Sequence, residues 1–199
     1  AQEQNLGCAP LPWAIPHPMA MVTNKKTNLF HSNVSHYELM RDLNRQWRQW
    51  TIDEPAVFIT FNGMSYDEEL VRRQFYWNLF ESYLTNTNGN GRLDILLMMN
   101  NIAAFSPDVL NIPLFNGGPG ISLKQADIAE ANGIEIGDAH DAIADCKLMI
   151  GLLEKINAKK PELIDFFLSI STKPGIQAAV EQPGFLALGE VCRREIFTY

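Results

Sequence analysis

The residues Ala56-Val-Phe-Ile-Thr-Phe61 constrain the fold more than any other segment of this chain. They form a short run of apolar and β-branched residues that ends at Asn62-Gly63. Such a run is typical of a strand buried on both faces, as in a parallel sheet. An amphipathic helical pattern with an acidic first turn follows it, from Ser65 to about Tyr83. A buried strand that leads into an amphipathic helix predicts an α/β protein.

The remaining segments extend this prediction. Apolar residues at three- and four-residue steps predict helices over 35–50, 93–105, 122–131, 141–157 and 161–170. Residues 8–18 hold four prolines, which favour a loop or an edge strand. Strands are expected at 185–188 and 190–198, beyond a boundary near residue 173. One clear central strand is too few for a sheet, so we expect that sheet-forming sequence is missing.

Charge and cysteine usage exclude several classes of protein. With 16 Lys and Arg against 23 Asp and Glu, the net charge is −7, so a broad cationic surface for nucleic acid is excluded, whereas a local basic strip stays open. No apolar run approaches the roughly 18 residues of a membrane span, and the first residues lack the pattern of a signal peptide. Cys8, Cys146 and Cys192 lie far apart without metal spacing. We therefore expect reduced thiols, a cytoplasmic location and no membrane partner.

Two places put acidic residues at sharp backbone transitions. The first is Asn62-Gly-Met-Ser-Tyr-Asp67, which runs from the C-terminal end of the predicted strand into the next helix. This end of a parallel sheet is where α/β proteins bind ligands. Asp67 is therefore a candidate ligand-binding residue. The alternative is that Asp67 only stabilises the helix start through its charge.

The second place is Asp138-Ala-His140-Asp141-Ala-Ile-Ala-Asp145. His140 and Asp145 would lie about 140° apart around an ideal helix, so they converge only if His140 belongs to the preceding loop. Asp145 stands among apolar residues and is expected to be buried, where a carboxylate costs several kcal/mol unless it is paired or bound to a metal. The alternative is an ordinary salt bridge for Asp145 and a capping role for His140.

Together the two motifs are more specific than either alone. Asn-x-x-x-Tyr-Asp at a strand end, followed by His-x-x-x-x-Asp on a helix, resembles the second and third motifs of the DEDD exonucleases, in the variant with a histidine. The flanking segments resemble bacterial exonuclease I over about residues 8–170, at 58–72, 75–80, 92–94, 131–134 and 139–145. The resemblance implies a ribonuclease H-like α/β exonuclease domain with an incomplete central sheet over 1–172. It also implies a linker and the start of an SH3-like domain over 173–199.

The resemblance further implies a 3′→5′ exonuclease that hydrolyses single-stranded DNA with two Mg²⁺ ions, for which Mn²⁺ can substitute, and that acts in DNA repair. Asp67 and Asp145 would be metal ligands and His140 the base that deprotonates the water. Asn62, Tyr66 and Arg72 would contact the substrate, and Asp94 would orient its neighbours. The expected partners are a single-stranded DNA 3′ end and a single-stranded DNA-binding protein.

The chain departs from the family in its first motif, an Asp-x-Glu pair on the first strand, which the residues before Cys8 do not contain. We therefore expect this chain to be inactive or impaired, either as a fragment or as a degenerate homologue. A non-catalytic module that binds single-stranded nucleic acid or a protein is the alternative, and a ribonuclease with the same site stays open. The aromatic residues of 75–80 are predicted to be core rather than a base-stacking surface.

Overall fold

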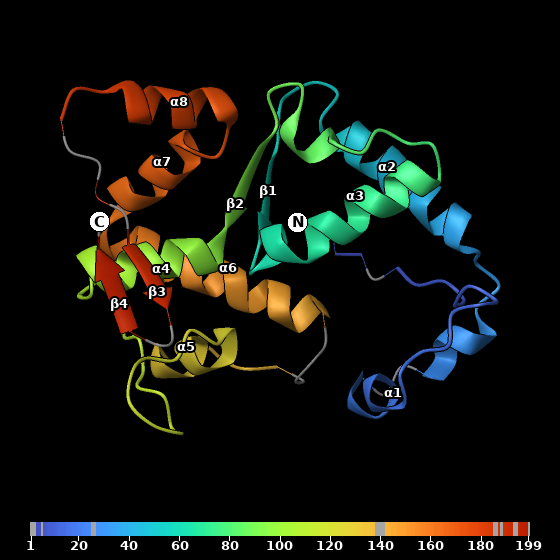
Figure 1. The fold of residues 1–199 in the computed structure, drawn as a ribbon, viewed down its shortest axis with the longest axis horizontal. Helices are drawn as coiled ribbons and strands as arrows, with labels where there is room; N and C mark the ends of the chain where they lie inside the picture. Colours follow the sequence, from blue (N-terminus) through green and yellow to red (C-terminus); the bar gives the residue numbers. More distant parts are fainter. Residues whose placement is uncertain are drawn as a thin grey trace.

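A two-stranded parallel sheet stands at the centre of the fold (Figure 1). The computed structural model describes residues 3–4, 6–24, 27–137, 142–184, 187, 189–192 and 195–198. Strand β1 (Val57–Thr60) pairs with β2 (Gly91–Asp94), with Thr60 opposite Asp94. Both strands therefore deliver the chain to the same edge of the sheet, where each is followed by a helix. The prediction of an α/β protein is confirmed.

Helices surround this sheet. The α-helices are α1 (Pro18–Asn24), α2 (His36–Trp50), α3 (Asp67–Trp77), α4 (Ile95–Phe105), α5 (Gln125–Ala131), α6 (Ala142–Lys159), α7 (Pro161–Ser169) and α8 (Lys173–Glu181). Short 3₁₀ helices are η1 (Thr27–His31), η2 (Gly63–Ser65) and η3 (Leu84–Asn86). No helix in the described part of the chain is both long and apolar enough to cross a membrane.

The main hydrophobic core lies where β2, α4, α5, α6 and α7 meet. Its members are Leu93, Ile95, Met98, Met99, Ile102, Val109, Leu110, Ile128, Leu152, Ile156 and Phe167. Each fully buried Leu or Ile contributes about 1.5–3 kcal/mol relative to an exposed side chain. This core fixes β2 and the start of α4, and so fixes the strand end at which the candidate site lies.

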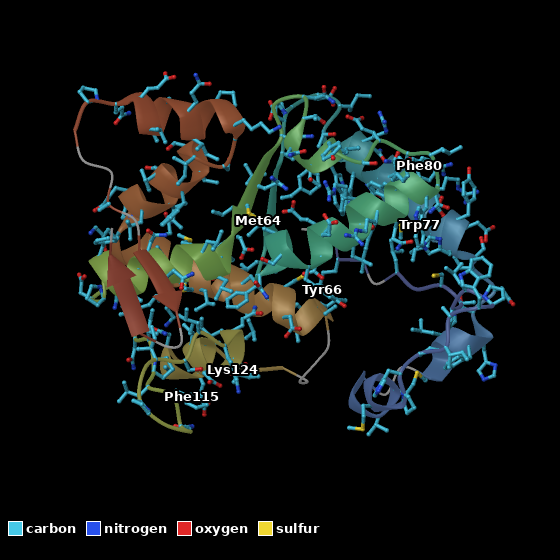
Figure 2. All side chains as sticks on the ribbon, viewed as in Figure 1. Met64, Tyr66, Trp77, Phe80, Phe115 and Lys124 are labelled. Atoms are coloured by element: carbon cyan, nitrogen blue, oxygen red, sulfur yellow. The ribbon has the colours of Figure 1, made fainter. Side chains whose placement is uncertain are left out.

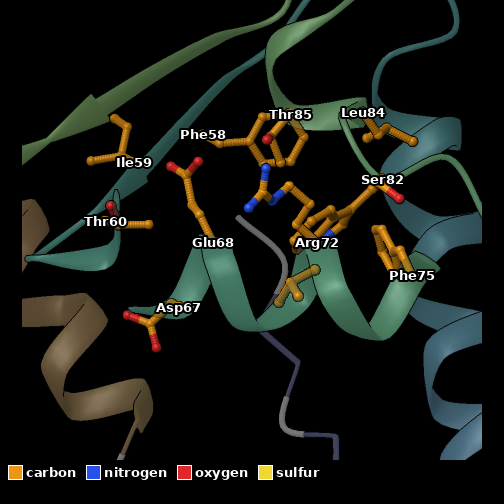
Figure 3. Close-up of a pocket in the computed structure, with 12 residues that line it drawn as sticks. Phe58, Ile59, Thr60, Asp67, Glu68, Arg72, Phe75, Ser82, Leu84 and Thr85 are labelled. Carbon is orange, nitrogen blue, oxygen red and sulfur yellow. The ribbon is translucent and has the colours of Figure 1, made fainter. Parts of the chain in front are cut away.

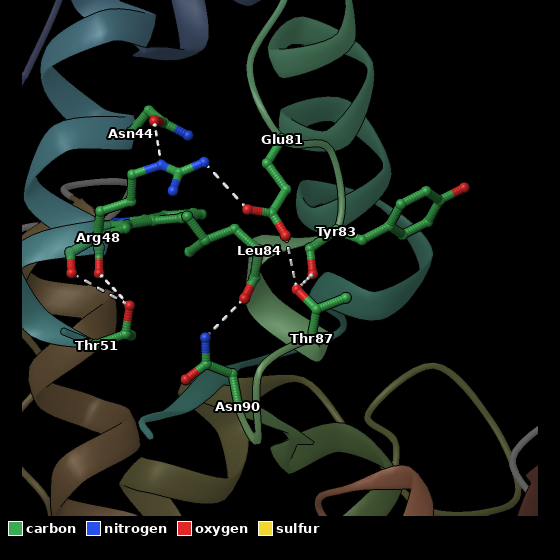
Figure 4. A network of polar contacts seen from close by, with 9 residues as sticks. Asn44, Arg48, Thr51, Glu81, Tyr83, Leu84, Thr87 and Asn90 are labelled. Atoms are coloured by element: carbon green, nitrogen blue, oxygen red, sulfur yellow. Dashed lines mark hydrogen bonds and ion pairs between the residues drawn. The ribbon is translucent and has the colours of Figure 1, made fainter. Parts of the chain in front are cut away.

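A polar network joins the end of α2 to the loop before β2 (Figure 4). The Arg48 guanidinium lies 3.1 Å from a Glu81 carboxylate oxygen, and the Thr87 hydroxyl donates to the other oxygen of Glu81 at 3.0 Å. The buried Asn90 donates to the Leu84 carbonyl and accepts from the Ala56 N–H, so it anchors this loop to the start of β1.

Several sequence predictions need correction. The helix from Ser65 ends at Trp77 rather than near Tyr83, because Leu79 takes a left-handed conformation with φ of 60°. The predicted helix over 93–105 begins at Ile95, after β2. A helix that sequence patterns did not predict, α8, begins at the proposed boundary.

The single strand predicted over 190–198 is instead a hairpin of two strands. Its strands are β3 (Gly189–Cys192) and β4 (Glu195–Thr198), which pair antiparallel and lie against α4 (Figure 1). Of the strand predicted over 185–188, three residues lie outside the described residues. The boundary near 173 and the SH3-like second domain stay predictions.

The strand β1 is less buried than its sequence predicts. Val57 and Ile59 are 37% and 38% exposed, whereas Phe58 packs against Trp47 with ring centroids 5.0 Å apart. Burial on both faces is therefore wrong for β1 in the described chain, because α2 and α3 cover only one of its faces.

Candidate active site

A tight turn links the end of β1 to α3. Asn62 has φ of 60°, a left-handed conformation that asparagine tolerates better than most residues. A Cβ on Gly63 would lie 2.4 Å from the Thr60 Cβ, so only glycine fits there. The chain then forms η2 and reaches Asp67, the first residue of α3. This geometry brings Asp67 back to the strand edge.

Asp94 holds this turn in place. Its carboxylate is buried, and one oxygen accepts the N–H of Asn62 at 2.7 Å and that of Leu96 at 3.0 Å. The other oxygen accepts the N–H of Met64 at 3.1 Å. Asp94 thus caps α4 and fixes the turn before Asp67, in agreement with the prediction that it orients its neighbours.

Asp67 lies at the exit of this turn (Figure 3). Partial burial raises the pKa of the Asp67 carboxyl, the nearby Asp94 carboxylate raises it further, and a hydrogen bond from its own backbone N–H opposes both. Asp67 is nonetheless an exposed residue, so its carboxylate is accessible to a ligand. In Figures 1 and 3 the start of α3 lies alongside α6, and Asp67 points toward that helix. A hard oxygen donor in this setting fits Mg²⁺.

Asp145 occupies the first turn of α6 and is exposed, so the prediction that it is buried is wrong. Its backbone carbonyl accepts a hydrogen bond from the Gln125 side chain at 2.6 Å. Because Asp145 is exposed, the cost of burying a charge gives no argument for a metal there. His140 lies outside the described residues. Within the described ranges, no three His, Cys, Asp or Glu side chains gather as a metal site.

The three predicted substrate residues differ in their surroundings. Asn62 is exposed at the turn, and Tyr66 is 68% exposed at the start of α3 (Figure 2). Arg72 is half-buried and already engaged, because it donates to the Tyr83 hydroxyl at 3.1 Å and pairs with Glu69. The connection from β1 to the first residue of α3 thus carries Asn62, Tyr66 and Asp67. Arg72 lies further along α3.

The structure adds one ion pair that sequence patterns did not indicate. Glu68 and Arg92 lie 2.6 Å apart, with the Glu68 side chain 10% exposed. They stand between α3 and β2, where Glu68 lines an apolar hollow of about 220 Å³ together with Trp47, Phe58 and Phe75 (Figure 3). The other Glu68 oxygen has no hydrogen-bond partner among the described residues. No sequence spacing links these two residues, because they meet only through the sheet pairing.

No family model matches the chain. It is 28% identical over 183 residues to exodeoxyribonuclease I of Buchnera aphidicola, an alignment that covers 89% of this chain and 37% of the relative. It is 30% identical over 136 residues to exodeoxyribonuclease I of Escherichia coli, covering 67% of this chain and 28% of the relative. The chain therefore spans well under half the length of the curated relatives it matches.

Solved structures show the same fold. The structure of E. coli exonuclease I in complex with a dA16 oligonucleotide superposes with a TM-score of 0.80 at 24% identity, over 94% of this chain and 39% of that one. A zinc-bound E. coli exonuclease I–single-stranded DNA complex gives 0.77 at 24% identity, over 94% and 39%. A complex described as ExoI/SSB-Ct gives 0.78 at 23% identity, over 93% and 39%. In sequence and in fold, this chain is thus similar to bacterial exonuclease I.

Proposed function

We propose that this chain carries part of the active site of a 3′→5′ exonuclease that hydrolyses single-stranded DNA. The observation that supports this most is the position of the Asp67 carboxyl, at the first residue of α3 beside the C-terminal edge of a parallel sheet. The relationship to exodeoxyribonuclease I supplies the reaction class.

In this proposal Asp67 and Asp145 hold Mg²⁺, for which Mn²⁺ can substitute. The bound ions would stabilise charge on the attacking and leaving oxygens of the phosphodiester. His140 would accept the proton of the attacking water, since the pKa of a histidine lies near working pH. Asn62 and Tyr66 would contact the terminal nucleotide, and Arg72 would exchange its bond to Glu69 for one to a phosphate.

Two carboxylates hold two Mg²⁺ ions weakly, so we expect low or no turnover unless further carboxylates reach the site. The second candidate is a non-catalytic module that binds single-stranded nucleic acid or a protein. The two candidates differ in metal dependence. The exonuclease requires Mg²⁺ for turnover, whereas the module binds 3′ ends with an affinity that Mg²⁺ does not change.

The test is digestion of end-labelled single strands with either the 3′ or the 5′ end blocked. It is run with this chain and with the longest reading frame that contains it. A functional site predicts Mg²⁺-dependent loss of nucleotides from free 3′ ends, abolished by Asp67→Asn and unaffected by Asp165→Asn on α7. Turnover that persists in Asp67→Asn, or that proceeds from 5′ ends, contradicts the proposal.

His140→Ala gives an independent check of the general base. We expect a rate lower by about two to four orders of magnitude, the usual contribution of general-base catalysis, with 3′-end binding retained. Undiminished turnover would assign His140 a structural role instead.

Two further proposals concern a protein partner and the location in the cell. Binding to a single-stranded DNA-binding protein is supported by the ExoI/SSB-Ct complex at 23% identity. A cytoplasmic location rests on the sequence pattern alone.

A further inference from the structure

The inward face of α3 carries a carboxylate among apolar side chains. Glu68 and Phe75 lie about two turns apart on this face, and the Glu68 side chain is 10% exposed while Phe75 is 1% exposed. Tyr76 and Trp77 lie on the outward face and are 71% and 67% exposed. The prediction that residues 75–80 form core therefore holds for Phe75 but is wrong for Tyr76 and Trp77. Glu68 stands where helical periodicity places a core residue.

The Glu68 carboxylate is paired through one of its oxygens. That oxygen lies 2.6 Å from the Arg92 guanidinium of β2, and the other is buried with no hydrogen-bond partner in the described part of the chain. A largely buried ion pair of this kind contributes little to stability, because the desolvation penalty offsets the attraction. Replacing such a pair by apolar residues of similar volume is often neutral or stabilising. Stability alone therefore does not account for Glu68 and Arg92.

Strand β2 holds the chain on both sides of Asp67. Arg92 and Asp94 are two residues apart on β2, so their side chains lie on the same face of the sheet. Asp94 accepts the Met64 N–H at 3.1 Å, three residues before Asp67. Arg92 binds Glu68, the residue directly after Asp67. Asp67 thus lies between two contacts that come from one strand.

The contact between Glu68 and Arg92 controls how the start of α3 is rotated about the helix axis. The N-cap residue Tyr66 makes no capping hydrogen bond with its side chain, so that side chain does not fix the first turn. Successive helical residues are about 100° apart around the axis, so the direction of Glu68 sets that of Asp67. Figure 3 shows Glu68 directed toward the strands and Asp67 directed toward α6.

A small rotation of α3 would displace the Asp67 carboxylate by more than a metal site tolerates. At about 5 Å from the helix axis, a rotation of about 20° moves the end of a side chain by roughly 1.7 Å. Metal-binding groups need to be held within about 0.5 Å of the productive geometry. Phe75 packs against Trp47 with ring centroids 5.6 Å apart, which fixes α3 farther along and leaves the first turn to contacts near Glu68.

We propose that the Glu68–Arg92 ion pair positions Asp67, by setting the direction of its carboxylate without binding the metal itself. Glu68 and Arg92 are positioning residues, because they act through Asp67. The inference rests on the proposed function, since it takes the same divalent cation as the ligand of Asp67. It adds two residues that the motifs do not include.

The test is titration of this chain with Mn²⁺, followed by the electron paramagnetic resonance signal of the free ion, which measures cation binding without turnover. The main variant is Glu68→Leu/Arg92→Met, which removes one negative and one positive charge and so keeps the net charge at −7. We expect it to weaken Mn²⁺ binding about 10- to 100-fold, the usual cost of losing a contact that orients a metal ligand. The matched control, Asp42→Leu/Arg45→Met, removes an exposed ion pair of α2 and should bind Mn²⁺ as the wild-type chain does.

The single variant Arg92→Met separates positioning from charge. It removes a positive charge, so electrostatics alone predicts tighter Mn²⁺ binding, whereas loss of positioning predicts weaker binding. It also leaves the Glu68 carboxylate buried and unpaired, which destabilises the chain. Urea denaturation therefore accompanies each titration, and the double variant decides alone if Arg92→Met does not fold.

The outcomes separate this proposal from the proposed function. If Asp67→Asn loses Mn²⁺ binding while Glu68→Leu/Arg92→Met binds as the wild-type chain does, the positioning role is wrong and the proposed metal site stands. Tighter binding by a folded Arg92→Met also overturns the positioning role, because only charge then matters. If Asp67→Asn binds Mn²⁺ as well as the wild-type chain does, both proposals fail.

Discussion

At the scale of single residues, Asp94 shows how a carboxylate can serve a site without binding a ligand. Both of its oxygens accept backbone N–H groups, from Asn62, Met64 and Leu96. Removing a buried acceptor leaves these donors unsatisfied, so Asp94→Ala should lower the free energy of unfolding by about 2–4 kcal/mol. Urea denaturation measures this loss.

The control for this prediction is Asp108→Ala, at an exposed aspartate of the loop after α4, which should change stability by less than about 0.5 kcal/mol. Asp94→Asn should fall between the two variants, because its amide keeps one acceptor oxygen. Equal stability of Asp94→Ala and the wild-type chain would show that the turn is held by other contacts.

Single residues also show which properties of a site cannot be predicted from sequence patterns. The family resemblance implies an orienting role for Asp94, and the structure agrees, since its carboxylate accepts three backbone N–H groups. Asp145 differs, because Leu148 and Leu152 lie near its helical face and are buried while Asp145 is exposed. Helical periodicity predicts which face turns inward, but not where the neighbouring core ends. The first turn of α6, which contains Asp145, extends beyond the edge of the hydrophobic core.

At the scale of elements, α2 begins with a capping box that links its stability to pH. The backbone N–H of Ser35 donates to the Glu38 carboxylate at 2.8 Å, and with the Ser35 hydroxyl it holds the pKa of Glu38 below its usual range. Because this pKa is lower in the folded chain, the stabilisation is present above the unfolded pKa of about 4.3 and is lost as pH falls through the folded value.

Glu38→Gln should therefore lower the Tm at neutral pH, and the difference from the wild-type chain should shrink toward zero near pH 3. Thermal unfolding followed by circular dichroism at several pH values measures the difference. Glu154→Gln, at an exposed position of α6, should show no such trend. A constant difference across pH would mean that the Glu38 charge contributes nothing to the cap.

The end of α3 gives a second prediction at this scale. Leu79→Gly removes the strain of a left-handed residue whose side chain is exposed, so the free energy of unfolding should rise by about 0.5–1 kcal/mol. Leu79→Ala keeps the Cβ and therefore the strain, and should not stabilise. Urea denaturation compares the two variants, and equal values would show that φ at this position carries no cost.

The same helix end explains a failed sequence prediction. Apolar and aromatic residues continue past Trp77, so periodicity extends the helix to Tyr83. Sequence offers no stop signal there, since neither glycine nor asparagine occupies the left-handed position. The local hydrogen bond from Phe80 to Phe75 and the packing of Phe80 on Tyr37 decide the end instead.

At the scale of the whole molecule, the central sheet is asymmetric. The outer side of β2 is covered, because the Arg92 N–H donates to the Ser171 carbonyl at 2.8 Å. In the described part of the chain, β1 pairs with β2 alone, so its other side presents unpaired backbone groups next to the half-exposed Val57 and Ile59. The sequence predicted that the sheet is incomplete, but the burial of β1 depends on neighbours that a strand pattern cannot reveal.

An apolar edge strand of this kind promotes pairing with other chains. We expect the chain to self-associate as its concentration rises, and Ile59→Lys to reduce that association, since a lysine at an edge disfavours strand pairing. Sedimentation velocity across a concentration series measures it. Val180→Lys, at a 64% exposed position of α8, adds the same charge without touching a sheet edge and should leave association unchanged. If both lysines act equally, net charge rather than the β1 edge controls self-association, and the asymmetry of the sheet has no consequence in solution.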